Sequence, residues 1–237
     1  MEESYEQEYF RQEKEQWWFQ ARRDLITKLN FPKDAKILEV GCGSGLNLKA
    51  LAQEDKIGLD ISAPAVKKAK SYGINAVVGD LNKKLAFKAE SFDVILALDV
   101  IEHLESDIDS INRLVTLLKP NGTFIMNVPA NMSLWSEHDI MNKHKKRYTK
   151  NEVKKLCKAA NLKQKTLSYW NMTLFPAVYT VIKLNKLLKR KQSHIDQPSP
   201  LVNKILLNIL KIENKLIHKG FTLPYGVSVF YIGNKSA

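Results

Sequence analysis

Three glycines at every second position are the residues of this chain best suited to hold a ligand. Gly41, Gly43 and Gly45 follow Glu39, which stands near the end of a short apolar run. Because glycine has no Cβ, the backbone can turn sharply there and approach a bound group closely. The next residues, Leu46 to Gln53, predict a helix whose amide-rich N-terminus would face the ligand. The pattern indicates a nucleotide-type site at the carboxyl end of a buried parallel strand.

Acidic residues stand at or near the ends of the next three apolar runs, and these runs also predict strands. The runs are Lys56–Ile61, Asn75–Val78 and Phe92–Leu98, and the acids are Asp60, Asp80 and Asp99. Parallel strands present their carboxyl ends at one edge of a sheet, and Asp60 could accept hydrogen bonds from both hydroxyls of a ribose there. The glycine spacing is not that of a dinucleotide site, because Leu46 stands where G-x-G-x-x-G has its last glycine.

A turn at Leu118–Gly122 and a fifth strand at Thr123–Val128 complete an ordered set of motifs. The set comprises Glu39 to Gly45, Asp60, Gly79-Asp80, Phe92-Asp93 through Glu102-His103, and Leu118 to Gly122. It resembles the class I S-adenosylmethionine-dependent methyltransferases over roughly residues 15 to 170, and most of all their ubiquinone-type O-methyltransferase branch. The resemblance implies an α/β, Rossmann-like sheet of seven mostly parallel strands, with helices on both faces and an antiparallel last strand. The implied cofactor is S-adenosyl-L-methionine and the product S-adenosyl-L-homocysteine.

The resemblance also implies which residues bind the cofactor. They are Glu39, Gly41, Cys42, Gly43, Gly45, Asp60, Ile61, Asp80, Leu81, Leu98 and Asp99, with Trp18, Phe19 and Arg22 from the N-terminal segment. Ser4 to Leu29 predict a helix, and its adjacent aromatic residues cannot all share one helix face. We expect either a lid whose aromatic rings attract the sulfonium cation or a helix that only covers the sheet. Cys42 is expected to be a small packed residue and not a nucleophile.

Methyl transfer requires an acceptor held in line with the methyl group and, for a hydroxyl, a group that removes its proton. His103 is the best candidate for that base because the ordinary pKa of histidine lies near neutrality. A structural or cofactor-contacting histidine is the alternative. No metal is expected, although Asp99, Glu102 and His103 form a possible divalent-metal set.

The segment after the fifth strand, residues 131 to 148, would cover the acceptor pocket. Its catalytic candidates are His138 and Tyr148, and its substrate-binding candidates are Trp135, His144 and Arg147. Lys143, Lys145 and Lys146 are at least as consistent with a solvated basic surface. Arg147 and Tyr148 could instead anchor the turn before a helix that starts with the capping box Thr149–Glu152.

Length and composition fit one globular domain with an additional element. The 237 residues are 44% hydrophobic, and no apolar run is long enough to span a bilayer. The first residues are acidic and polar, unlike a signal peptide. Two cysteines, Cys42 and Cys157, make no disulfide framework. The expected location is the cytoplasm, with membrane association possible.

The net charge of +12 is concentrated in the second half of the chain. Residues 1–139 contain 17 basic and 22 acidic residues, whereas residues 140–237 contain 20 basic and only 3 acidic residues. This asymmetry indicates an anionic partner: a membrane surface, a nucleic acid or a phosphorylated substrate.

The chain departs from the family pattern between its last two predicted strands, Gln164–Trp170 and Val227–Ile232. About fifty residues, Asn171 to Gly226, replace the usual short turn. We therefore divide the chain into a lid segment (1–30), a methyltransferase core (31–170 plus 224–237) and a basic amphipathic helical insert (171–223).

The insert predicts two helices around a polar break at residues 190–200. The first carries an apolar stripe followed by basic residues: Phe175, Val178, Tyr179 and Ile182, then Lys183, Lys186, Lys189, Arg190 and Lys191. The second carries Val202, Ile205, Leu206, Ile209, Ile212 and Leu216 on one face, and Lys204, Lys211, Lys215 and Lys219 largely elsewhere. Such helices can lie on an anionic membrane surface. They can equally form a hairpin packed on their own sheet or on a second subunit.

The sequence therefore predicts methyl transfer to a small-molecule or lipid-linked acceptor, with oxygen as the favoured acceptor atom and a membrane surface as a candidate location. Strand four is followed by Asp99-Val-Ile-Glu102 and not by the Asn/Asp-Pro-Pro-aromatic motif of enzymes that methylate bases or glutamine. An RNA methyltransferase is the first alternative, but nucleic acid is less favoured because the lysines alternate with aliphatic rather than aromatic residues. A non-catalytic cofactor-binding scaffold is the second. Oligomeric state stays open.

Overall fold

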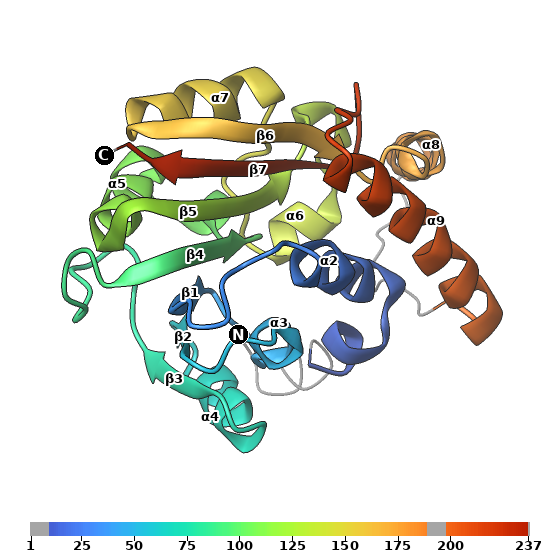
Figure 1. Ribbon diagram of the computed structural model, residues 1–237. Helices are drawn as coiled ribbons and strands as arrows, with labels where there is room; N and C mark the ends of the chain where they lie inside the picture. Colours follow the sequence, from blue (N-terminus) through green and yellow to red (C-terminus); the bar gives the residue numbers. More distant parts are fainter. Residues whose placement is uncertain (1–9, 189–197, 237) are drawn as a thin grey trace.

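The computed structural model describes residues 10–188 and 198–236 and contains one seven-stranded sheet (Figure 1). The strand order is β3-β2-β1-β4-β5-β7-β6. The strands are β1 (Ile37–Val40), β2 (Lys56–Asp60), β3 (Asn75–Val78), β4 (Phe92–Leu98), β5 (Leu118–Pro129), β6 (Leu162–Trp170) and β7 (Ser228–Lys235). Only β7 runs antiparallel to its neighbours, so the predicted Rossmann-like α/β fold is confirmed.

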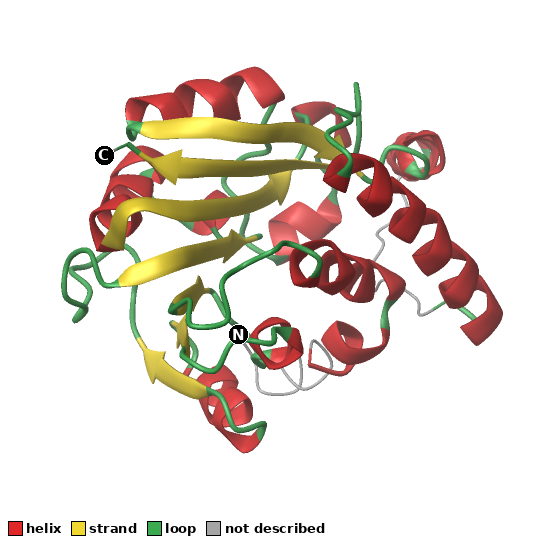
Figure 2. Cartoon of the chain, viewed as in Figure 1, coloured by secondary structure: helices red, strands yellow, loops and turns green. Residues whose placement is uncertain are grey.

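Helices cover both faces of this sheet (Figure 2). They are α2 (Trp17–Thr27), α3 (Leu46–Ala50), α4 (Ala63–Ser71), α5 (Asp107–Leu117), α6 (Glu137–Met141), α7 (Lys150–Ala159), α8 (Phe175–Leu187) and α9 (Pro200–His218), with short 3-10 turns η1 (Ile101–His103) and η2 (Met132–Leu134). Side chains cap the starts of two of these helices, and the second cap, at Thr149, confirms a prediction. Ser62 accepts a hydrogen bond from the Ala65 amide at the start of α4, and Thr149 and Glu152 form the capping box of α7.

The central strands form where the sequence has continuous apolar runs. All residues of β1 are buried, as are all but one of β4, because helices cover both faces of these strands. Glu39 of β1 lies level with Gly58 of β2 and Leu96 of β4. The carboxyl ends of β1, β2 and β4 therefore meet at one edge, where the glycine loop begins.

Several predicted boundaries were wrong by a few residues. Helix α3 ends at Ala50 and not at Gln53. Residues 118–122 do not form a separate turn but begin β5, since Leu118 already pairs with Phe92. The register of β5 against β4 shifts between Leu118 and Thr123, and Asn121, which lies in this stretch, has a positive φ of 61°. The segment predicted as a loop over the acceptor pocket contains the short helix α6.

The N-terminal helix is interrupted, contrary to the single helix predicted from Ser4 to Leu29. Residues 10–15 are helical, Gln16 is extended, and α2 follows; the start of the predicted helix, residues 4–9, lies outside the described residues. Asn203 of α9 bridges the break. Its side chain accepts a hydrogen bond from the Trp17 amide at 2.8 Å and donates one to the Glu15 carbonyl at 3.0 Å. The break is therefore stabilised by a residue of the insert.

Helix α9 is also joined to α2 and to β6 through the fully buried side chain of Asn214. Its Oδ1 accepts a hydrogen bond from Trp170 Nε1 at 2.9 Å, and its Nδ2 donates to the Ala21 carbonyl and to Asp24 Oδ2, both at 2.9 Å. Leu210 and Ile217 of α9 enter the same hydrophobic cluster as α2. The predicted lid and the predicted insert thus share one core.

No helix within residues 10–188 and 198–236 combines the length and the apolar character needed to cross a bilayer.

We expect Asn214→Ala to lower the free energy of unfolding by about 2–4 kcal/mol, because it leaves a cavity and a buried Trp170 N–H without an acceptor. Urea denaturation measures this effect. The control is Asn208→Ala on the exposed side of the same helix. Equal effects of the two substitutions would contradict the proposed role of Asn214.

Candidate active site

The glycine loop between β1 and α3 adopts a backbone that requires glycine. Gly41, Gly43 and Gly45 have φ values of 64°, 52° and 77°, in the left-handed region. A Cβ on Gly41 would lie 2.9 Å from Cγ2 of Val100, so the loop and the end of β4 touch. Asp60 ties the loop to β2, because its Oδ2 accepts a hydrogen bond from the Gly43 amide at 2.8 Å. The predicted loop residues and Asp60 are therefore brought together.

Glu39 is a buried carboxylate with unused hydrogen-bonding capacity. Its Oε1 accepts a hydrogen bond from Asn47 Nδ2 at 2.7 Å, whereas Oε2 is buried and has no partner among the described residues. Burial, which outweighs the hydrogen bond from Asn47 and the charge of Arg22, raises the pKa of Glu39 to about 8. A cationic group of a bound ligand would satisfy Oε2 and favour the ionised form.

A second buried acid, Glu13, lies against the loop. Its Oε2 accepts hydrogen bonds from the Ser44 amide at 3.2 Å and the Ser44 hydroxyl at 2.6 Å. A Cβ on Gly43 would lie 3.4 Å from both Glu13 carboxylate oxygens, and burial raises the pKa of this acid. A ligand in the loop must therefore displace Glu13 or bind beside it. Glu13 was not predicted as a site residue, because no motif spacing connects it to Ser44.

The predicted lid residues contact the end of β4 through Arg22. This buried guanidinium forms an ion pair with Asp99 and lies 5.0 Å from the ring centroid of Trp18 and 5.2 Å from that of Phe19. Asp99 adopts a φ of 55° and also accepts a hydrogen bond from Asn127 at the end of β5, at 2.8 Å. Asn127 was missed, although its position at a strand end was a usable signal.

The other cofactor candidates occupy less polar positions. The side chains of Leu81 and Leu98 are buried in the core, which leaves only their backbone for a ligand. Ile61 is 68% exposed at the rim of the site. The Cys42 thiol is buried and packs so tightly on β2 that a Cβ on Gly58 would lie 2.6 Å from its sulfur. Burial raises the pKa of Cys42, which agrees with a packed residue.

Asp80 is half-buried after β3. Its Oδ1 accepts hydrogen bonds from the amide and the side chain of Asn82, at 2.9 and 3.1 Å, and Lys83 lies 3.8 Å from Oδ2. Asp80 therefore organises its own turn at the rim of the sheet.

Beyond β4, the chain brings Glu102, His103 and His144 together, with one ligand atom of each within 4.8 Å of the others. The rings of His103 and His144 meet edge to face at a centroid distance of 4.7 Å. Both carboxylate oxygens of Glu102 are buried and without a hydrogen-bond partner in the described part of the chain. Burial, reinforced by the charge of Asp99, raises the pKa of Glu102, whereas burial and then His144 lower the pKa of His103 to about 4.

This cluster differs from the metal set considered in the sequence analysis. Asp99 turns to Arg22 and Asn127, and His144 joins Glu102 and His103 in its place. Two imidazoles and one carboxylate are a ligand set that several divalent transition metals accept. The residues that could hold a metal are therefore Glu102, His103 and His144.

Asp139 on α6 orients His144 and Arg147 and was missed in the sequence analysis. Its Oδ1 lies 2.9 Å from His144 Nδ1 and 2.8 Å from Arg147 Nε, and its Oδ2 lies 3.0 Å from Arg147 Nη2. Burial acts to raise the pKa of Asp139, but the hydrogen bonds from His144 and Arg147 outweigh it and lower the pKa. Arg147, predicted as a substrate contact, is buried in this ion pair.

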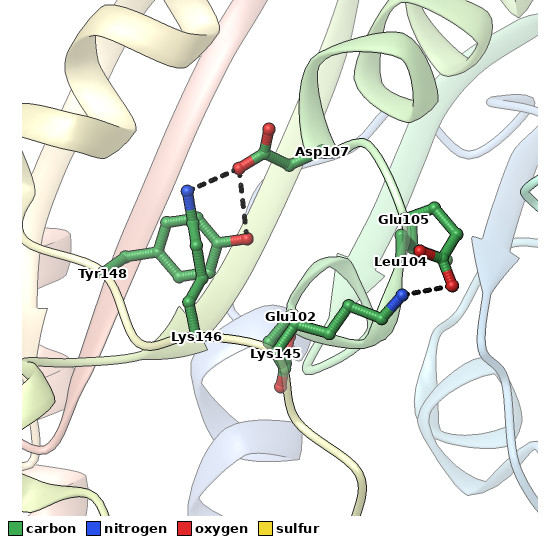
Figure 3. A pocket seen from close by; sticks show the side chains of 7 residues that line it. All are labelled: Glu102, Leu104, Glu105, Asp107, Lys145, Lys146 and Tyr148. Atoms are coloured by element: carbon green, nitrogen blue, oxygen red, sulfur yellow. Dashed lines mark hydrogen bonds and ion pairs between the residues drawn. The ribbon is translucent and has the colours of Figure 1, made fainter.

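Tyr148 lines a small cavity on the other side of Glu102 (Figure 3). The cavity has a volume of about 180 Å³ and is lined by Glu102, Leu104, Glu105, Asp107, Lys145, Lys146 and Tyr148. Both lysines form ion pairs, Lys145 with Glu105 and Lys146 with Asp107. The Tyr148 hydroxyl donates to Asp107 Oδ2 at 3.4 Å, and burial together with Asp107 raises its pKa, so this phenol holds its proton.

The remaining candidates lie around α6. His138 is exposed, hydrogen-bonds with Asn142 at 3.2 Å and lies 6.1 Å from the His144 ring, whereas Trp135 is half-buried before the helix. Of the three predicted catalytic residues, His103 is the one adjacent to both Glu102 and His144.

We expect Glu39→Gln to stabilise the ligand-free protein increasingly between pH 5 and 8. The pKa of Glu39 is higher in the folded state than in the unfolded chain. As the pH rises above the unfolded-state pKa, Glu39 therefore ionises in the unfolded chain first, and the wild type loses stability. The difference in unfolding free energy should grow by roughly 2–3 kcal/mol over this range. Denaturation at several pH values measures it, with Glu54→Gln at an exposed site as the control; a pH-independent difference would contradict the buried-acid interpretation.

Comparisons with known proteins agree with this geometry. A family model described as "Methyltransferase domain" matches residues 9–167. The human probable tRNA methyltransferase 9B is 35% identical over 95 residues, which cover 39% of this chain and 21% of that protein. The ubiquinone biosynthesis O-methyltransferase of Haemophilus ducreyi is 32% identical over 115 residues, 44% of this chain and 49% of that enzyme. The chain thus spans less than half the length of either relative.

Solved structures share the fold at low sequence identity. A Haloferax volcanii putative methyltransferase, in a complex with the Trm112 activator, has a TM-score of 0.66 at 16% identity and covers 99% of this chain and 95% of that chain. A possible histamine N-methyltransferase from Thermotoga maritima gives 0.63 at 18% identity, covering 97% and 95%. Haemonchus contortus phosphoethanolamine N-methyltransferase 2, solved with S-adenosyl-L-methionine, gives 0.59 at 16%, covering 93% and 53%.

The family model covers more than half of the chain, and the sheet order, the glycine loop and the strand-end acids agree with it. The chain therefore belongs to the methyltransferase-domain family.

Proposed function

We propose that the protein methylates an oxygen of a small-molecule or lipid-linked acceptor, with S-adenosyl-L-methionine as methyl donor. The observation that carries the proposal is the position of two groups of residues at one edge of the sheet. The glycine loop with Glu39 and Asp60 lies beside β4, whose end leads directly to Glu102 and His103. A cofactor site and a cluster of one buried acid and two half-buried histidines are thereby adjacent.

The residues fit the cofactor. Gly41 leaves space that a Cβ would close, and the partnerless Oε2 of Glu39 can accept a hydrogen bond from the ammonium group of the cofactor. Asp60 is the group for the ribose hydroxyls, and Arg22 can bind the carboxylate of the methionine moiety. The aromatic rings of Trp18 and Phe19 lie beside the Arg22 guanidinium, and they can attract the sulfonium cation of the cofactor in the same way.

S-adenosyl-L-methionine supplies an electrophilic methyl group, so the protein's task is to orient the acceptor and remove its proton. His103 can perform the second task. Its lowered pKa leaves the imidazole neutral at pH 7, with a nitrogen lone pair available. His144, held by Asp139, packs against the His103 ring and can orient it. Tyr148 and Arg147 are assigned to the walls of the site and not to proton transfer.

Oxygen is favoured over an amide nitrogen because Asp99-Val-Ile-Glu102 follows β4. The ubiquinone-type relative supports a small acceptor, whereas the probable tRNA methyltransferase relative and the Trm112-bound neighbour favour RNA. RNA methylation is the second candidate function, since the 20 basic residues after position 139 could bind phosphates.

Asp60→Ala should weaken S-adenosylmethionine binding at least tenfold, because it removes both the ribose acceptor and the hydrogen bond that holds the Gly43 amide. Isothermal titration calorimetry measures the affinity. Asp55→Ala, at an exposed acid directly before the start of the same strand, is the matched control. Unchanged affinity of the Asp60 variant would exclude the proposed site.

Incubation with methyl-labelled cofactor and a cell extract should label the lipid or small-molecule fraction. We expect His103→Ala to lose this labelling by about 100-fold while it still binds the cofactor, since a positioned base contributes roughly 10²–10⁴ in rate. His218→Ala on α9 is the control. Label in RNA would establish the second candidate, and full activity of the His103 variant would remove that residue from the mechanism.

A further inference from the structure

The outward side of α9 presents a continuous apolar stripe that residues 10–188 and 198–236 leave exposed. The stripe consists of Leu201, Ile205, Ile212 and Leu216. Spacings of four, seven and four residues place these side chains on one side of the helix, and they are 69%, 49%, 60% and 36% exposed. Leu210, Asn214 and Ile217 occupy the opposite side and are buried. Helix α9 therefore has two apolar sides, of which only one packs on the protein.

Helix α8 repeats this arrangement. None of its residues is fully buried, and Phe175, Val178 and Ile182 form its half-buried side. Its outward side carries Val181, Leu184 and Leu188, which are all exposed. Glu213 holds the two helices in position, since its carboxylate accepts hydrogen bonds from the Met172 and Thr173 amides just before α8. We call the outward sides of α8 and α9 the insert face.

Lysines border the insert face without acidic neighbours on the same helices. Lys204, Lys211 and Lys215 follow the spacing of the α9 stripe with an offset of one residue, so they form a parallel row beside it. On α8, Lys183 and Lys186 lie on the side opposite Val181, Leu184 and Leu188, so the lysine row of the insert face belongs to α9. The sole acid of α8 and α9 is Glu213, and its side chain is buried and bonded to backbone amides. The insert face is therefore apolar with an uncompensated positive border.

We propose that the insert face binds an anionic lipid bilayer, with α8 and α9 lying in the plane of the interface. An apolar stripe beside a lysine row is the arrangement that interfacial helices use: the aliphatic side chains enter the acyl boundary and the ammonium groups reach the headgroups. RNA fits less well because α9 offers no aromatic ring for base stacking. A symmetric contact with a second copy would bring lysine rows of like charge together.

Binding in this orientation would place the cofactor site next to the membrane. The inner side of α9 holds the N-terminal segment through Asn203 and Asn214, and Arg22 of that segment pairs with Asp99 at the site. Figure 1 shows α9 beside α2. A lipid-linked acceptor would then reach the enzyme from the bilayer. This last step rests on the proposed function; binding of the insert face to lipid does not.

The test is sedimentation of the full chain with vesicles, without cofactor. Vesicles of phosphatidylcholine alone are compared with vesicles that also contain phosphatidylglycerol, over a series of salt concentrations. We expect binding to the anionic vesicles only. The charge variant carries Lys204→Glu, Lys211→Glu and Lys215→Glu, and it should bind at least about tenfold more weakly, since each lysine near an anionic surface contributes roughly a fivefold factor.

Two further variants separate the insert face from net charge. The charge control carries Lys67→Glu, Lys70→Glu and Lys88→Glu, the same charge change at exposed sites outside the insert, and should bind like the wild type. The apolar variant, Ile205→Ser with Ile212→Ser, should bind more weakly and release at lower salt. Circular dichroism and thermal unfolding verify that each variant is folded.

The proposal is overturned if the wild type does not bind anionic vesicles at low salt, if the charge control loses as much affinity as the charge variant, or if the apolar variant binds normally. Tighter binding to RNA than to vesicles, lost in the charge variant, would assign the face to nucleic acid. A dimer abolished by the apolar variant would assign it to a second copy. None of these outcomes depends on methyl transfer, whose failure appears separately in the cofactor titration.

Discussion

The ion pair between Arg22 and Asp99 is the interaction on which the arrangement of the site depends. Arg22 is buried among Trp18, Phe19 and the end of β4, where a guanidinium without a carboxylate partner would be strongly unfavourable. The pair therefore holds α2 against the carboxyl edge of the sheet. With α2 in this position, the preceding helical residues bring Glu13 onto the glycine loop. The cofactor site is closed by the same segment that would contact the cofactor.

This closure extends to the insert, which makes the N-terminal segment, the sheet and α9 interdependent. Asn203 stabilises the break before α2, and Asn214 links α2 to Trp170 of β6. Each is a buried or half-buried amide that uses both its donor and its acceptor, so neither helix can move without loss of hydrogen bonds. Binding of α9 to a partner such as lipid would therefore involve a helix that is hydrogen-bonded to the segment over the cofactor site.

Three of the buried acids of the site, Asp139, Glu39 and Glu102, differ in their partners and therefore in their protonation. Asp139 is paired with Arg147 and His144 and stays ionised. Glu39 and Glu102 keep unpartnered oxygens, and burial raises their pKa values. Unpaired buried acids are costly for the ligand-free protein, which is consistent with groups that find their partners only when cofactor and substrate are bound. The acids that would bind the ligands therefore lower the stability of the ligand-free protein at this edge of the sheet.

The sequence by itself determined the central strands, the glycine loop and the acids at the strand ends, because these features depend on local apolar runs and on backbone conformations that only glycine adopts readily. The arrangement of the sheet was implied by the family resemblance. Tertiary structure decided the partners of those residues. Glu13, Asn127 and Asp139 come from segments that no spacing rule connects to the loop, and His144 replaced Asp99 beside Glu102 because Arg22 binds Asp99. Periodicity marked apolar sides on α9, but which side the core covers depends on how α2 and β6 pack against it. The stripe identified from sequence around Ile205 and Ile212 is the uncovered one, since the Asn214 hydrogen bonds turn the other side inward.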